Sequence, residues 1–437
     1  MEARKLPSKA FPVYKIKTSA MEDDMKRIGK VLLGVIILLG YMGVICFGVM
    51  LVIEDEKKGS PVFVSQAIRG EAVESQWKQM QQPLEKVSRW LEEEILYEEK
   101  LSSSIENMIA DMTLEQKLAQ MMILTNENDI TAANLQTYQP GGIIFFEVDF
   151  RGKSMETVRN RVDTLQSYMN TPLLVGVDEE GGVVSRLKTL AETNLPDFQG
   201  ARKLYQTGVD AVKQDTETKM QYLTAMGINL NFAPVADVVS EKSSYMYTRS
   251  ASGEAIEVSE YVETVLKTMN EMEVMGCIKH FPGYGNNVNT HDELAKDTRS
   301  LSEYEESDFL PFEKGIETGV DMIMVSHIVM ESVDESNPAS LSPTVHDILR
   351  EDFSFRGVII ADDLNMQAIL KTMTIETATA KAFVAGNDMI FSADFAASMR
   401  GGKKAVEQGD LSEEQINESV ERILRMKIEN GLIEMEE

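Results

Sequence analysis

The sequence predicts an α/β protein in which a closed (β/α)₈ barrel follows an N-terminal transmembrane helix and a helical stalk. Three observations predict this architecture. A long uncharged run lies near the N-terminus, a polar segment with helical spacing comes next, and eight short apolar runs then alternate with helical patterns towards the C-terminus.

The composition is that of a globular protein with a large core, since 43% of the 437 residues are hydrophobic. The formal net charge of -28 argues against nucleic acid as a partner, because phosphate binding requires clustered Lys and Arg. The two cysteines, Cys46 and Cys277, give neither a disulfide framework nor a zinc quartet.

Residues 31–53 contain no charged side chain, and a helix of this length crosses a hydrocarbon core of about 30 Å. No small-residue cleavage site follows before Glu54, which favours an uncleaved anchor over a signal peptide. Residues 1–30 hold eight Lys/Arg and four Asp/Glu, a net of +4. The positive-inside rule therefore places this tail in the cytoplasm and the rest of the chain outside the cell membrane. A buried core helix is the alternative interpretation of the run.

Residues 54–107 predict a helical stalk. The segment is rich in Glu, Gln, Lys and Ser, and its apolar residues recur at roughly helical spacing: Trp77, Leu84, Val87, Leu91, Ile95 and Leu96. Amphipathic spacing does not distinguish a spacer from a helix docked on the barrel. The barrel domain, residues 108–437, opens where Thr113 and Gln116 predict a capping box.

Eight apolar, β-branched runs predict the barrel strands, and long helical patterns separate most of them. The runs are 121–124, 142–146, 173–177, 230–235, 277–280, 322–326, 358–361 and 389–392. Eight strands alternating with helices over roughly 300 residues favour a closed barrel. An open doubly wound sheet stays the alternative.

Polar residues follow or close five of these runs. They are Asp178, Glu179 and Glu180 after the third, Asp237 at the fourth, Lys279 and His280 at the fifth, His327 at the sixth, and Asp362 and Asp363 at the seventh. A helix cap is at least as good an interpretation of Asp237 or Asp363 taken alone. The convergence of acids, a lysine and imidazoles on one barrel rim nevertheless predicts a functional site.

Elimination narrows the chemistry of that site. The four histidines form no His-x-His pair and no His-Glu-x-x-His motif, which disfavours a metal site. The segment after the last strand, residues 392–395, is acidic and does not suit phosphate. The remaining combination fits sugar chemistry without a cofactor: a carboxylate for an oxocarbenium-like centre, a proton donor, and Lys, Arg and Asp for hydroxyl groups.

Four segments resemble the motifs of family 3 glycoside hydrolases. They are DEEGG with the following Arg-Leu at 178–187, NFAPVAD at 231–237, KHFPGYG at 279–285 and VIIADDL with the following Met at 358–366. The resemblance covers about residues 105–437 in order. It implies a barrel that hydrolyses glycosidic bonds.

The resemblance also implies roles for individual residues. Asp362 matches the nucleophile that forms a covalent glycosyl-enzyme, so hydrolysis is expected to retain the anomeric configuration. Asp178, Lys279 and His280 match positions that hold sugar hydroxyls, and Arg249 does so in a looser match.

One bacterial branch of the family, the single-domain β-N-acetylglucosaminidases, takes its acid/base from a loop histidine, which His291 matches. An imidazole with an ordinary pKa of about 6.5 suits that role near neutral pH. The aspartate that normally supports this histidine is replaced by Asn289, which cannot stabilise an imidazolium by its charge. Asp292 and Asp297 are alternative supports, and slower catalysis is expected.

The sequence thus predicts a membrane-tethered, exo-acting β-N-acetylhexosaminidase whose partner is an extracellular or cell-wall glycan containing N-acetylglucosamine. A β-glucosidase-like hydrolase is one alternative. A catalytically weak glycan-binding or scaffold protein is the other, because of Asn289. The sequence does not specify the oligomeric state.

Overall fold

The computed structural model describes residues 70–125, 127–285 and 294–435. The predicted cytoplasmic tail, the predicted span at 31–53, His291 and Asn289 lie outside these residues. None of the helices in the described ranges is both long and apolar enough to span a bilayer. The predicted domain boundaries at residues 30, 53 and 107 stay predictions.

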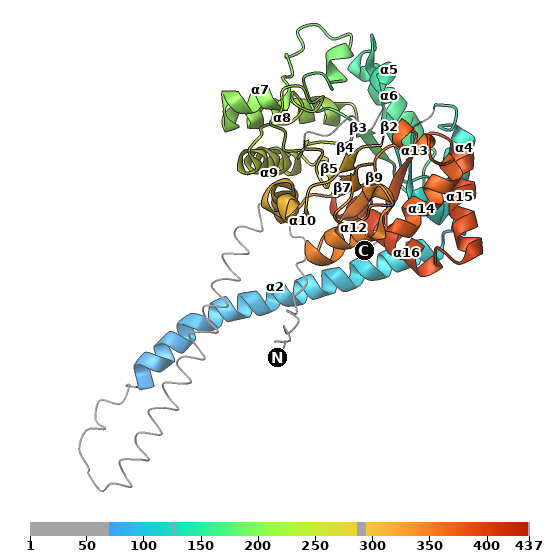
Figure 1. Cartoon of the computed structure of the whole chain (residues 1–437). Coiled ribbons are helices and arrows are strands. Elements are labelled where there is room, and N and C mark those ends of the chain that lie inside the picture. Colours follow the sequence, from blue (N-terminus) through green and yellow to red (C-terminus); the bar gives the residue numbers. More distant parts are fainter. Residues whose placement is uncertain (1–69, 126, 286–293, 436–437) are drawn as a thin grey trace, which may run out of the picture. The chain divides into compact units, whose positions relative to one another are not determined.

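A closed barrel of eight parallel strands forms the centre of the described chain from Ser104 onward (Figure 1). The strand order is β1-β2-β3-β4-β5-β7-β9-β10, and β10 pairs with β1 to close the barrel. The strands are β1 (Met122–Leu124), β2 (Gly142–Phe145), β3 (Leu174–Val177), β4 (Leu230–Asn231), β5 (Met275–Phe281), β7 (Met322–Val325), β9 (Val358–Ala361) and β10 (Met389–Ser392). This closure confirms the predicted barrel and excludes the open sheet.

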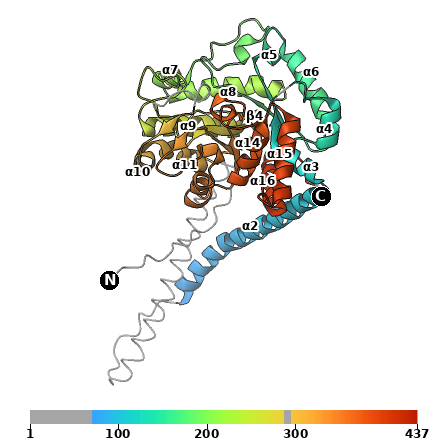
Figure 2. The same ribbon diagram turned by 45° about the vertical axis from the view of Figure 1, so that its right-hand side comes forward.

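Helices surround the barrel strands, as the view in Figure 2 also shows. They are α3 (Leu114–Gln120), α4 (Ala132–Tyr138), α5 (Glu147–Phe150), α6 (Met155–Gln166), α7 (Ala201–Thr207), α8 (Val209–Ala225), α9 (Ala255–Glu271), α10 (Leu301–Glu303), α11 (Phe309–Glu317), α12 (Pro343–Asp347), α13 (Gln367–Leu370), α14 (Ile375–Ala385), α15 (Phe395–Gln408) and α16 (Glu413–Glu429). Short 3₁₀ helices are η1 (Leu187–Thr189) and η3 (Ala339–Leu341), and short π-helices are η2 (Tyr304–Asp308) and η4 (Ile348–Asp352). Upstream, α2 (Gly70–Ala110) is a single 41-residue helix.

The predicted capping box is present at the start of α3. The Thr113 side chain accepts from the backbone N–H of Gln116, and the Gln116 side chain accepts from the backbone N–H of Thr113. The two bonds satisfy donors that a helix N-terminus otherwise leaves unpaired.

The fourth and fifth strands differ from their predicted bounds. The ladder of β4 ends at Asn231, three residues before Pro234, which has no N–H to donate. The strand β5 begins two residues earlier than predicted and continues through His280 to Phe281, whose carbonyl accepts from the backbone N–H of Ser326. As a result β5 carries both Lys279 and His280 within the barrel wall.

An aromatic pair packs tightly in the barrel interior. The Phe232 ring packs edge-to-face on Phe391, with centroids 5.0 Å apart. A Cβ atom at Gly176 of β3 would lie 2.5 Å from the same Phe232 ring. Glycine at 176 therefore makes room for this aromatic pair.

Buried charges lie at the amino ends of the strands. Asp388 pairs with Arg350 at 2.5 Å and with Arg422 at 3.0 Å. Its Oδ2 also accepts from the backbone N–H of Ile359, at 2.8 Å. Lys427 of α16 is fully buried and donates to Gln120 Oε1 at 3.0 Å.

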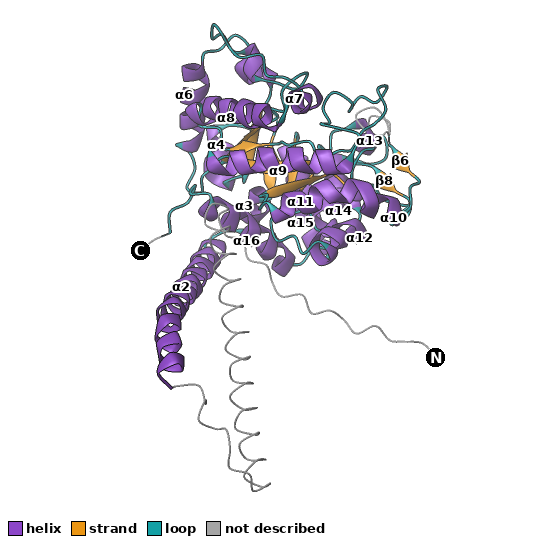
Figure 3. Cartoon of the chain, turned by 90° about the vertical axis from the view of Figure 1, so that its left-hand side faces the viewer, coloured by secondary structure: helices purple, strands orange, loops and turns teal. Residues whose placement is uncertain are grey.

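A second, two-stranded sheet joins β6 (Lys296–Asp297) to β8 (Val329–Met330). Figure 3 shows this pair apart from the barrel strands. It connects the segment after β5 with the segment after β7, so both follow the carboxyl end of the barrel.

Candidate active site

The sequence-predicted residues of the described chain follow the carboxyl ends of different strands. Asp178 comes directly after β3, Lys279 and His280 lie near the end of β5, and Asp362 comes directly after β9. Arg249 lies in the connection between β4 and α9. Because parallel strands of a closed barrel end at the same rim, these residues share the face on which barrel enzymes carry their chemistry.

Lys279 joins two of the acidic side chains. Its Nζ lies 2.7 Å from Asp178 Oδ1 and 2.8 Å from Glu180 Oε1, and the side chain is almost fully buried. Burial would lower the pKa of Lys279, but Asp178 and Glu180 outweigh it and raise that pKa. Lys279 is therefore a firmly charged donor.

Glu180 also binds Arg249 through two parallel hydrogen bonds. Arg249 Nε donates to Glu180 Oε2 and Nη2 to Oε1, both at 2.8 Å. Burial alone would raise the pKa of Glu180, but Arg249 and Lys279 hold it well below its usual range. The two-point geometry fixes the plane of the guanidinium group.

His280 is held by Asp237, which follows β4. His280 Nδ1 lies 2.8 Å from Asp237 Oδ2, and the backbone N–H of Tyr284 donates to Asp237 Oδ1 at 2.7 Å. Asp237 is fully buried. A carboxylate bound to Nδ1 orients an imidazole ring and leaves Nε2 for another partner.

Asp362 is half-buried at the start of the loop after β9. Its backbone N–H donates to the carbonyl of Val325 at 2.9 Å, and its Oδ1 accepts from the backbone N–H of Asp363 at 2.8 Å. Strand pairing and the adjacent turn thus fix the position of this carboxylate.

The other polar residues near these strand ends have structural contacts. Asp363 Oδ1 accepts from the backbone and side-chain amides of Asn365, so it closes a turn and does not cap the next helix, α13, whose N-cap is Met366. The buried His327 ring lies 2.7 Å from Ser340 Oγ and 2.9 Å from the carbonyl of Asp363. Glu179 Oε2 accepts from the backbone N–H groups of Arg186 and Leu187, and burial raises the pKa of Glu179.

The structure adds three residues to the predicted site. Glu180 was visible in the DEEGG motif, but only the fold shows that it bridges Lys279 and Arg249. Arg186, eight residues after Asp178, lies 3.6 Å from the Asp178 carboxylate. Asp237 has its carboxylate on His280, so here the cap interpretation is wrong.

His291, the predicted acid/base, lies outside the described residues, as do Asn289 and Asp292. Asp297, the other predicted support for His291, is bound at both oxygens by Arg299. Within the described ranges, no group of three or more His, Cys, Asp or Glu side chains is placed to hold a metal ion. The absence of a metal and of a cofactor stays a prediction.

This arrangement has the chemistry of a polyol-binding site. Lys279 and Arg249 supply charged N–H donors, Asp178 and Glu180 supply acceptors, and each is already oriented by a partner. Such fixed donors and acceptors bind the vicinal hydroxyl groups of a sugar. The half-buried Asp362 carboxylate lies at the same rim, directly after β9.

Comparison with known families gives one match that covers most of the chain. The model described as "Glycosyl hydrolase family 3 N terminal domain" matches residues 113–426. A beta-hexosaminidase of Nitrosomonas eutropha is 31% identical over 256 residues, which are 57% of this chain and 72% of that protein. A beta-hexosaminidase of Idiomarina loihiensis is 29% identical over 330 residues, which are 73% of this chain and 96% of that protein.

Solved structures of similar fold include a family 3 beta-N-acetylglucosaminidase from Paenibacillus sp. str. FPU-7. The TM-score is 0.69 with 29% sequence identity, and the match covers 74% of this chain. It covers 63% of the Paenibacillus chain, so this chain spans less than two thirds of that protein.

Proposed function

Since this chain belongs to glycoside hydrolase family 3, and is therefore a glycoside hydrolase, we propose that it removes terminal N-acetylglucosamine from glycans as a retaining exo-β-N-acetylhexosaminidase. The names of its relatives support N-acetylglucosamine as the sugar that it removes. The observation that carries the proposal is the set of ion pairs that joins Asp178, Lys279 and Arg249 through Glu180 at the barrel rim.

In the proposed mechanism, a carboxylate oxygen of Asp362 attacks the anomeric carbon of the bound sugar. The bond between that carbon and the glycosidic oxygen breaks, and His291 gives its proton to the departing oxygen. His291 then removes a proton from water, which attacks the anomeric carbon and releases Asp362. Two inversions give net retention.

The binding residues supply the orientation that these steps require. Asp178 and Lys279 would hold neighbouring hydroxyl groups, and His280 would present Nε2 because Asp237 occupies Nδ1. Arg249 would donate from Nη1, which Glu180 does not bind and which also lies 3.1 Å from Met246 Sδ. Holding the sugar beside Asp362 in this way lowers the entropic part of the barrier.

The proposal is tested by hydrolysis of a chromogenic N-acetylglucosaminide with the wild type and the Asp362→Asn variant. We expect turnover by the wild type, a loss of at least about 10³-fold in the variant, and an unchanged melting temperature. The matching glucoside discriminates a β-glucosidase. Glucoside hydrolysis that exceeds N-acetylglucosaminide hydrolysis would overturn the proposed sugar specificity.

A second candidate, a glycan-binding or scaffold protein of low activity, is favoured by Asn289 in place of the usual carboxylate. Saturable binding of N-acetylglucosamine oligomers without turnover of any substrate would support this candidate over the hydrolase.

We further propose that residues 31–53 anchor the barrel on the outer face of the cell membrane and that its substrate is an extracellular or cell-wall glycan. The uncharged run and the +4 balance of residues 1–30 support this topology. Full-length protein should sediment with membranes, and protease added to intact protoplasts should remove the barrel. A fragment that begins at residue 54 should be found in the supernatant.

A further inference from the structure

A buried ion cluster lies behind the pair formed by His280 and Asp237. Arg299 Nε and Nη2 donate to both carboxylate oxygens of Asp297, and Nη1 donates to Asp308 Oδ2 at 2.6 Å. Asp297 is 3% exposed and Asp308 1%. The guanidinium of Arg299 lies over the Tyr304 ring, 4.3 Å from its centroid. One cation thus serves two buried carboxylates.

The turn from Gly283 to Gly285 lies directly on this cluster. Arg299 Nη2 is 3.5 Å from the carbonyl of Gly283. A Cβ atom at Gly283 would lie 2.5 Å from Asp308 Oδ1, and one at Gly285 would lie 2.8 Å from Arg299 Nη2. Both glycines have positive φ, 117° and 51°. Their missing side chains allow the backbone to touch the charged groups.

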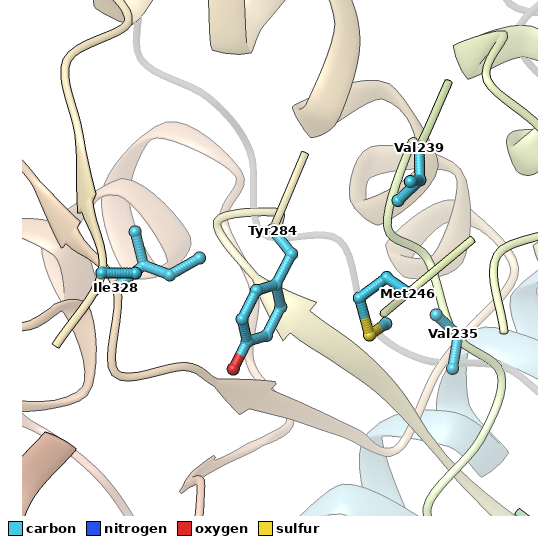
Figure 4. Packing of buried hydrophobic residues seen from close by; sticks show 6 residues of the cluster. Val235, Val239, Met246, Tyr284 and Ile328 are labelled. Carbon is cyan, nitrogen blue, oxygen red and sulfur yellow. The ribbon is translucent and has the colours of Figure 1, made fainter. Parts of the chain in front are cut away.

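The same turn leads back to His280. The backbone N–H of Tyr284 donates to Asp237, whose other oxygen lies 2.8 Å from His280 Nδ1. The Tyr284 ring stands perpendicular to the His280 ring at 5.1 Å. Figure 4 shows Tyr284 between Ile328 and Met246, in the buried cluster that packs around it.

We infer that Arg299 and Asp308 are positioning residues for His280: they hold the turn from Gly283 to Gly285, which holds Asp237 and thereby the imidazole. The inference rests on the proposed function, because the role of His280 on the substrate is part of that proposal. Arg299 and Asp308 contact the turn and each other, and their proposed role does not require contact with a sugar.

The charges around Asp308 favour this role over a purely local ion pair. Burial raises the pKa of Asp308 to about 6, Arg299 opposes the rise, and Asp237 and Asp297 add to it. Tyr304, which lies in η2 together with Asp308, also faces the cluster. The charge of Asp237 therefore reaches Asp308 across the turn.

A double-mutant cycle tests the inference through N-acetylglucosaminide hydrolysis by the full-length protein. We expect Asp308→Asn to lower kcat/KM about tenfold in the wild type but less than twofold when His280 is already alanine. Equal losses in both backgrounds would overturn the inference. The matched control is Asp388→Asn, which also removes a buried arginine partner but at the opposite end of the barrel. It should change kcat/KM less than twofold.

A second readout does not depend on activity. The chain has four histidines, so ¹⁵N-histidine spectra contain few imidazole signals, and those of His280 are identified by their loss in His280→Ala. Asp308→Asn and Arg299→Lys should shift the His280 signals and leave those of His346 in place, since His346 Nδ1 is bound to the carbonyl of Ser342. Unchanged His280 signals would overturn the inference. A wild type without turnover would contradict the proposed function instead.

Discussion

The Glu180→Gln substitution is expected to weaken both hydrolysis and folding, because it removes the negative charge that faces two buried cations. Glu180, Arg249 and Lys279 have side-chain exposures of only 4%, 12% and 3%. The glutamine Oε1 can still accept from Lys279 and from Arg249 Nη2, but Oε2, which accepts from Arg249 Nε, is lost. The glutamine NH₂ group would oppose a donor of Arg249.

The expected loss of free energy depends on the partners that Lys279 and Arg249 keep in the variant. Removing one partner of a buried ion pair costs about 3–5 kcal/mol. Lys279 keeps Asp178 at 2.7 Å, so most of the loss falls on Arg249, which donates two hydrogen bonds to Glu180. We therefore expect about 3 kcal/mol in total, which corresponds to roughly 150-fold if all of it is lost from kcat/KM.

The assay combines kcat/KM for the chromogenic N-acetylglucosaminide with urea denaturation, so that the two parts of the loss are measured separately. The matched variant is Glu179→Gln at the neighbouring buried position. There Oε2 of the carboxylate accepts from the backbone N–H groups of Arg186 and Leu187, and an amide oxygen can accept the same two bonds. We expect a change of about threefold or less for Glu179→Gln. The reasoning is refuted if Glu180→Gln retains kcat/KM within threefold and its free energy of unfolding within about 0.5 kcal/mol.

Four further predictions concern single substitutions. Arg249→Lys should raise KM about tenfold in steady-state kinetics, because an ammonium group cannot reproduce the two-point contact with Glu180. Asn289→Asp should raise kcat by restoring a carboxylate near the predicted acid/base, and a fall or no change would contradict an impaired dyad. Burial lowers the pKa of Lys427 to about 7 from 10.5, so the folded protein binds fewer protons than the unfolded chain between these values and its stability rises with pH there. The free energy of unfolding that Lys427→Met gains over the wild type, measured by urea denaturation, should therefore shrink by about 3 kcal/mol from pH 7 to pH 9.5. Gly176→Ala should lower the free energy of unfolding by about 1–3 kcal/mol, because its methyl group would overlap the Phe232 ring, and an unchanged urea midpoint would count against the tight packing described here.

Local sequence signals located all eight barrel strands. Their apolar runs reflect burial on both faces, a property of each segment that survives without knowledge of its neighbours. The boundaries were less well determined where backbone chemistry interrupts the ladder. At Pro234 the apolar run continues although the regular ladder of β4 ends at Asn231, and an isolated bridge between Val235 and Lys279 follows it.

The candidate site shows the same division. Asp178, Lys279, His280 and Asp362 were predicted from their positions at strand ends and from their motifs, and the structure places each at the carboxyl rim. The role of Asp237 was not predicted, because a carboxylate after a strand has the same local pattern whether it caps a helix or binds a distant imidazole. Its partner His280 is 43 residues away.

The sequence by itself determined the barrel fold, the family and the residue types of the rim, because periodicity and short motifs are encoded within single segments. Only the tertiary structure decided that Glu180 bridges Lys279 and Arg249 and that Arg299 and Asp308 lie behind His280. These contacts join loops from different strands. Their energies depend on distance and burial, which barrel closure creates and which no single segment contains.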